Sequence, residues 1–126
     1  MSKKILVIEN DPDVREIVSL VLEEEGYSVT ATKHIPMEDL SASGTHLIVL
    51  DEWLPNNVAG HLFCLKIKEV HELMHIPIII LSTAHNIEEI ACACKADGFV
   101  SKPFDLDTLL AEVKRCCSPQ PLIDIS

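Results

Sequence analysis

Short apolar runs alternate along the chain with longer segments in which apolar residues recur every three or four positions. An apolar run bounded by turn residues predicts a strand, and the three-to-four spacing predicts an amphipathic helix. Strands are predicted at residues 5–8, 27–32, 46–50, 77–82 and 98–101. The segments between and after them predict helices that start near residues 12, 36, 62, 87 and 106.

Polar residues mark several boundaries of these elements. Asp11 is predicted to cap the first helix, with Pro12 at its first position and Gly26 as its stop. Asn86 and Asp105 are predicted to cap the last two helices. We expect a turn at residues 41–44, a loop at 52–59 and a frayed tail from residue 118.

Alternation of strands and helices favours right-handed crossovers and a parallel sheet with helices on both faces. The prediction is therefore an α/β protein, a flavodoxin-like (βα)5 three-layer sandwich formed by residues 1–117, with 118–126 as a C-terminal tail. The strand order 2-1-3-4-5 follows by analogy with that fold. In this order Glu9, Asn10 and Asp51 share the crevice where strands one and three diverge.

Composition narrows the classes of function. The 126 residues suit one domain, and 48% hydrophobic with 24% charged residues indicates a globular protein. Twenty acidic residues against ten basic ones, a net charge of −10, argue against direct binding of nucleic acid by this domain. Five scattered cysteines predict reduced thiols, and the apolar runs are too short to span a membrane, so a cytoplasmic location is expected.

Residues 71–75 read His-Glu-Leu-Met-His, which matches the H-E-x-x-H pattern of zinc peptidases. That chemistry needs both histidines on one helix and a third ligand. Pro77 begins a predicted strand two residues later, which places His75 in a loop. A small metallopeptidase is therefore the weakest interpretation. On the fourth helix, Cys92 and Cys94 are predicted to point to different sides.

Four motifs follow four of the five predicted strands, and together they resemble the receiver domain of two-component response regulators over residues 4 to about 117. They are Glu9-Asn10 after strand one, Asp51 after strand three, Thr83-Ala84 after strand four and Lys102-Pro103-Phe104 after strand five. The resemblance implies that Asp51 is the phosphoacceptor and that Lys102 pairs with it. It also implies that Thr83 bonds the phosphoryl group and that Phe99 is an aromatic switch residue.

The resemblance further implies a Mg²⁺ site made by Glu9, Asn10, Asp51 and the backbone carbonyl of Trp53, and a cis peptide bond before Pro103. A carboxylate can attack phosphorus, and Mg²⁺ and a lysine can offset the charge of the transferring group. The implied partners are a histidine kinase or phosphotransfer protein and an output domain or effector. No enzymatic activity is implied beyond self-phosphorylation and autodephosphorylation, and homodimerisation is left open.

Three departures from the family pattern motivate an alternative. Asn10 stands where the family usually has aspartate, so weaker metal binding is expected. Gly60 comes one residue later than usual, and the segment between Thr83 and Lys102 is about two residues short. Trp53 is bulky for a neighbour of the acceptor and is expected to slow the access of water. The alternative is a pseudo-receiver, an interaction module that is not phosphorylated or binds Mg²⁺ weakly.

Overall fold

The computed structural model describes residues 3–54 and 58–117. Five of its strands form one parallel sheet of order β2-β1-β3-β6-β7, which is the predicted order 2-1-3-4-5. The predicted tail at 118–126 and the middle of the predicted 52–59 loop lie outside the described residues. The strands are β1 (Lys4–Ile8), β2 (Ser28–Thr32), β3 (Leu47–Asp51), β6 (Ile78–Ser82) and β7 (Gly98–Ser101).

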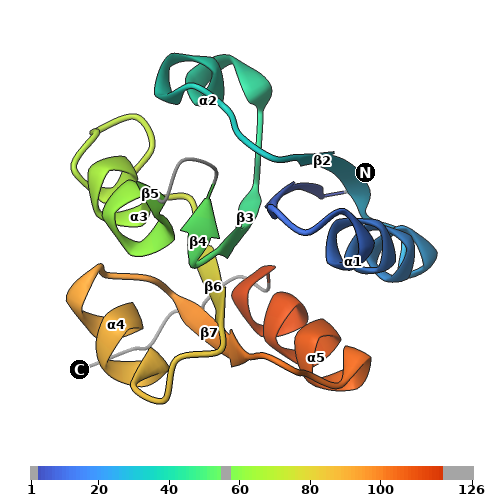
Figure 1. Cartoon of the computed structure of the whole chain (residues 1–126). Coiled ribbons are helices and arrows are strands. Elements are labelled where there is room, and N and C mark those ends of the chain that lie inside the picture. The colour runs from blue at the N-terminus through green and yellow to red at the C-terminus, as the bar shows by residue number, and fades with distance from the viewer. Residues whose placement is uncertain (1–2, 55–57, 118–126) are drawn as a thin grey trace, which may run out of the picture.

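Helices cover both faces of this sheet (Figure 1). They are α1 (Pro12–Glu24), α2 (Met37–Ser43), α3 (Gly60–Lys68), α4 (Ile87–Ala93) and α5 (Leu106–Cys117). Successive residues of a strand face opposite sides, so two apolar clusters form. One cluster joins the sheet to α1 and α5, and the other joins it to α2, α3 and the end of α4. The predicted three-layer sandwich is confirmed.

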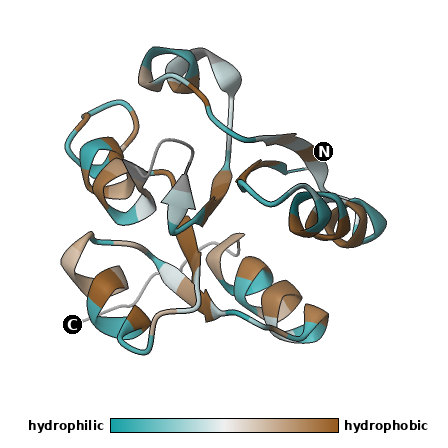
Figure 2. Ribbon diagram, viewed as in Figure 1, coloured by the Kyte–Doolittle hydropathy of each residue, from teal (hydrophilic) through white to brown (hydrophobic). Residues whose placement is uncertain are grey.

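The central strands β3 and β6 are buried along their whole length, which explains why they are uninterrupted apolar runs in the sequence. Figure 2 shows them as hydrophobic, with hydrophilic positions on the helices around them. Both strands nevertheless end in a polar residue, Asp51 in β3 and Ser82 in β6, and both of these residues are buried. The carboxyl edge of the sheet therefore carries polar groups in a largely apolar setting.

The cap of α1 is as predicted. The Asp11 carboxylate accepts hydrogen bonds from the backbone N–H groups of Asp13 (2.9 Å) and Val14 (3.4 Å). The chain leaves the helix through Gly26, whose φ of 95° lies in the left-handed region that favours glycine.

Other boundary predictions were wrong in whole or in part. Residues 41–43 continue α2 instead of forming a turn, and Gly44 (φ 69°) is the C-cap that follows the helix. Asn86 stands at the N-cap of α4, but its side chain makes no capping hydrogen bond with any described residue. The predicted 52–59 loop contains a short antiparallel pair, β4 (Trp53–Leu54) and β5 (Val58–Ala59).

The helices of the described ranges are all too short or too polar to cross a membrane.

Candidate functional site

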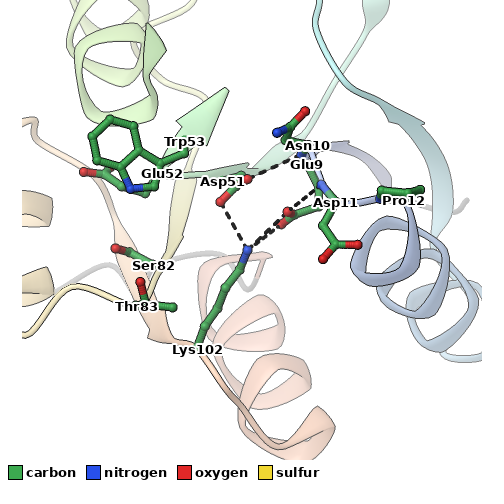
Figure 3. A pocket seen from close by; sticks show the side chains of 10 residues that line it. All are labelled: Glu9, Asn10, Asp11, Pro12, Asp51, Glu52, Trp53, Ser82, Thr83 and Lys102. Atoms are coloured by element: carbon green, nitrogen blue, oxygen red, sulfur yellow. Dashed lines mark hydrogen bonds and ion pairs between the residues drawn. The ribbon is translucent and has the colours of Figure 1, made fainter. Parts of the chain in front are cut away.

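A pocket of about 420 Å³ opens where β1, β3, β6 and β7 end (Figure 3). Parallel strands end at the same edge, so residues far apart in the sequence meet there. Its lining consists of Glu9, Asn10, Asp11, Pro12, Asp51, Glu52, Trp53, Ser82, Thr83 and Lys102. Six of the seven predicted site residues are in this set, and only Phe99 is not.

Lys102 joins the two central carboxylates of the pocket. Its Nζ lies 3.2 Å from Asp51 Oδ1 and 3.2 Å from Glu9 Oε1, and it donates a hydrogen bond to each (Figure 3). The second Glu9 oxygen, Oε2, lies 3.1 Å from the same nitrogen. Asp51 Oδ2 accepts a longer bond, 3.4 Å, from the backbone N–H of Asn10. One ammonium group thus faces two carboxylates.

Glu9 is fully buried, and this changes its acidity. Burial first, and then the neighbouring Asp51 carboxylate, raise the pKa of Glu9 from 4.5 to about 7, while Lys102 opposes the rise. The pKa rises because the Glu9 carboxylate is poorly solvated and lies beside a second negative charge. A cation bound beside Glu9 and Asp51 would offset this negative charge.

Four acidic residues line the pocket, but two of them are engaged elsewhere. The Asp11 carboxylate caps α1, and the Glu52 carboxylate pairs with His61. Glu9 and Asp51 remain, and Asn10 is exposed, with its side-chain amide directed away from Lys102 in Figure 3. Within the described residues, no group of three or more His, Cys, Asp or Glu side chains is arranged to hold a metal ion.

The oxygen ligands still fit a hard cation. Glu9 Oε2 is buried and accepts no hydrogen bond in the described structure, although it pairs with the Lys102 ammonium at 3.1 Å, and Asp51 offers a second carboxylate. Mg²⁺ takes one or two carboxylates and keeps several of its waters, so this pair suffices for a weak site. The loss of one charge at Asn10 makes it weaker than a site with three carboxylates.

The structure separates the two hydroxyl candidates at the end of β6. Ser82 is buried, and its Oγ accepts a hydrogen bond from the backbone N–H of Ala84 at 3.0 Å. Thr83 lines the pocket and is exposed, so its hydroxyl is accessible to a ligand. Thr83 is therefore the better placed of the two. The Lys102–Pro103 peptide bond is cis, as the resemblance implied.

Phe99 lies apart from the pocket. It belongs to β7, is 36% exposed, and lines shallow grooves together with residues of α4 and α5. Phe99 is a surface residue between two helices, three residues before Lys102 in the sequence.

Glu52 and its partner His61 were not predicted as site residues from the sequence. Glu52 follows the buried strand β3 and is only 3% exposed, and its Oε1 lies 3.0 Å from His61 Nδ1. The two residues are nine positions apart on different elements, so neither period of secondary structure connects them. Only the observation that the acidic side chain directly follows a buried run could have suggested an unusual environment.

The zinc peptidase arrangement is not formed. Helix α3 ends at Lys68, and both His71 and His75 lie beyond it in exposed positions. The two cysteines of the α4 region differ as predicted, since Cys92 is exposed and Cys94 is buried.

Fold and pocket together define a class: a flavodoxin-like α/β domain with two carboxylates and a lysine at the carboxyl edge of its sheet. The family model "Response regulator receiver domain" matches residues 5–114, and the chain belongs to this family. Phosphorylation on an aspartate is the general function of the family, which generally uses Mg²⁺ for it.

Curated relatives agree with this assignment. The chain is 32% identical to the nitrogen assimilation regulatory protein NtrX of Azorhizobium caulinodans over 91% of its own length and 26% of that protein. It is also 32% identical to response regulator ArlR of Staphylococcus saprophyticus, over 97% of its own length and 57% of ArlR. The chain therefore spans between about a quarter and just over half of these relatives.

A solved structure supports the fold independently. The receiver domain of a signal transduction histidine kinase from Syntrophus aciditrophicus superposes with a TM-score of 0.83 at 27% identity. The match covers 99% of this chain and 97% of that one.

Proposed function

We propose that Asp51 accepts a phosphoryl group from the phosphohistidine of a histidine kinase or phosphotransfer protein. One observation carries the proposal: the Lys102 ammonium lies 3.2 Å from Asp51 Oδ1 while it is also bound to the buried Glu9. A lysine fixed at this distance can stabilise the negative charge on the phosphoryl oxygens as phosphorus approaches the carboxylate.

In the proposed reaction, a carboxylate oxygen of Asp51 forms a bond to phosphorus while the phosphorus–nitrogen bond of the donor breaks. The electron pair of that bond returns to the donor imidazole. Lys102 supplies a point charge to the phosphoryl oxygens, and the exposed Thr83 hydroxyl donates a hydrogen bond to one of them. Mg²⁺, held by Glu9, Asn10, Asp51 and the Trp53 backbone carbonyl, would neutralise further charge on the group.

The acyl phosphate would act as a switch. A phosphoryl group that favours one position of Thr83 shifts the balance between two states of the domain, and Phe99 would report the shift at the surface made by α4, β7 and α5. The proposed receiver unit is residues 1–117, acting in the cytoplasm. Its partner on the output side would be a further domain or an effector protein.

Acetyl phosphate is a direct test of the chemistry. Incubation of the full chain with acetyl phosphate and Mg²⁺ is expected to add one phosphoryl group by intact mass, and Asp51→Asn is expected to remove the adduct. No adduct at saturating Mg²⁺ would contradict the proposal and would favour a receiver fold that signals without phosphorylation.

A further inference from the structure

Glu52 is a buried carboxylate that the proposed chemistry does not use. It stands between Asp51 and Trp53, and Figure 3 shows it beside Trp53 with its carboxylate turned away from Lys102. Its Oε1 lies 3.0 Å from His61 Nδ1, and because a carboxylate only accepts, the imidazole donates. Its Oε2 is buried and finds no hydrogen-bond partner among the described residues. His61 is thus the one cationic or donor group recorded for this carboxylate in the described structure.

The backbone of Glu52 is also held by hydrogen bonds on both sides. The N–H of Glu52 donates to the carbonyl of Leu81 in β6 at 2.9 Å, and the carbonyl of Glu52 accepts from the N–H of Gly60 at the start of α3. Gly60 approaches so closely that a Cβ there would collide with the carbonyl oxygen of Asp51. The exit of β3 is therefore held between β6 and the first turn of α3.

We infer that Glu52 and His61 are positioning residues for the candidate metal site. Their pair fixes the direction in which the chain leaves β3, and with it the placement of the Asp51 carboxylate and the Trp53 backbone carbonyl. The inference rests on the proposed function of that site. A buried carboxylate without a partner is strongly unfavourable, so loss of His61 would drive Glu52 toward water and turn the adjoining peptides. Mutation of groups that hold metal ligands in place typically lowers metal affinity by about 10–100-fold.

The test compares Mg²⁺ affinity with stability in the same proteins. Trp53 is the only tryptophan of the chain and lines the pocket, so its fluorescence reports a Mg²⁺ titration. His61→Leu is expected to weaken Mg²⁺ binding roughly tenfold. His61→Asn keeps an N–H donor at the position of Nδ1 and is expected to bind within about threefold of the wild type. His75→Leu, the same change at an exposed histidine outside the site, is the matched control and is expected to bind like the wild type.

A double variant separates positioning from stability. Replacement of a buried charged pair by apolar side chains of similar size is often neutral or stabilising, so Glu52→Leu with His61→Leu is expected to fold. Apolar packing does not restore the direction of the hydrogen bond, and the double variant is expected to show the same roughly tenfold loss of Mg²⁺ affinity. Urea unfolding of each variant, without metal, gives the stability.

The outcomes are distinct. Lower stability of His61→Leu with Mg²⁺ affinity unchanged in both the single and the double variant would show a merely structural pair and would overturn the inference. A wild-type chain that binds no Mg²⁺ would overturn it as well. If the wild type binds Mg²⁺ and both variants lose affinity, but acetyl phosphate leaves no adduct, the positioning inference stands and only the proposed phosphotransfer fails.

Discussion

Restoring an acidic residue at position 10 should strengthen the metal site. Asn10 lines the pocket beside Glu9 and Asp51, so Asn10→Asp adds one negative charge where a bound cation would lie. The substitution replaces the side-chain NH₂ group by an oxygen of nearly the same size. It leaves in place the backbone N–H that donates to Asp51. Ser28→Asp, at the exposed start of β2 and the opposite end of the sheet, adds the same charge as a control.

The magnitude follows from the exposure of the position. Because Asn10 is exposed, screening is close to that of water, where two unit charges 4 Å apart interact by about 1 kcal/mol. A divalent ion doubles this to about 2 kcal/mol, which corresponds to roughly a 30-fold lower Kd for Mg²⁺. Without metal, the added carboxylate repels Glu9 and Asp51, so the variant is expected to be less stable than the wild type. Asn10→Asp is thus expected to tighten Mg²⁺ binding but to lower the free energy of unfolding of the metal-free protein.

Mg²⁺ titration followed by Trp53 fluorescence measures the Kd, and urea unfolding with and without Mg²⁺ measures the stability. A change in Kd of less than about twofold for Asn10→Asp, or equally tighter binding in Ser28→Asp, would contradict this prediction. Either result would mean that the charge at position 10 does not control how the pocket holds the ion.

Three further predictions concern the pKa of Glu9, the ion pair of Lys68 and the accessibility of two cysteine thiols. Because the pKa of Glu9 is raised from 4.5 to about 7, the folded chain keeps a proton that the unfolded chain releases. The metal-free protein should therefore lose stability as the pH rises from about 4.5 to about 7, and Glu9→Gln should flatten that part of a urea-unfolding profile. Lys68→Met should lower the free energy of unfolding by about 2–3 kcal/mol, since the buried ammonium bonds Asp97 at 2.7 Å and two backbone carbonyls; an unchanged urea midpoint would refute this. Peptide mapping after brief alkylation should find Cys92 modified and the buried Cys64 protected until denaturant is added, and equal rates would contradict the burial.

The parallel sheet was predictable because its signal is local. β3 and β6 are buried on both faces, so each reads as a run of apolar residues, and the polar residues that end them mark the carboxyl edge. Strand order came instead from analogy with the flavodoxin-like fold, and the role of each polar residue came from the resemblance to a family. Physical patterning alone places Glu9 and Asp51 at strand ends and does not say which strands are neighbours.

What the sequence did not reveal depends on contacts between distant residues. The β4–β5 pair is two residues long on each side, too short to leave a period in the sequence. The Glu52–His61 pair joins a strand exit to a helix start, and the burial that makes it informative appears only after α3 has docked on β3. The extension of α2 to Ser43 was missed because two of its last three residues are serines, which are typical of turns as well.

We propose that Asp51 carries the phosphoryl group, and a chemical label can identify the phosphorylated residue directly. Borohydride reduction of the chain after treatment with acetyl phosphate and Mg²⁺ converts an aspartyl phosphate to homoserine, which tandem mass spectrometry locates in a peptide. We expect homoserine at position 51, dependent on Mg²⁺ and on Lys102. Homoserine at another aspartate, or an unmodified Asp51 in a folded chain that binds Mg²⁺, would contradict it.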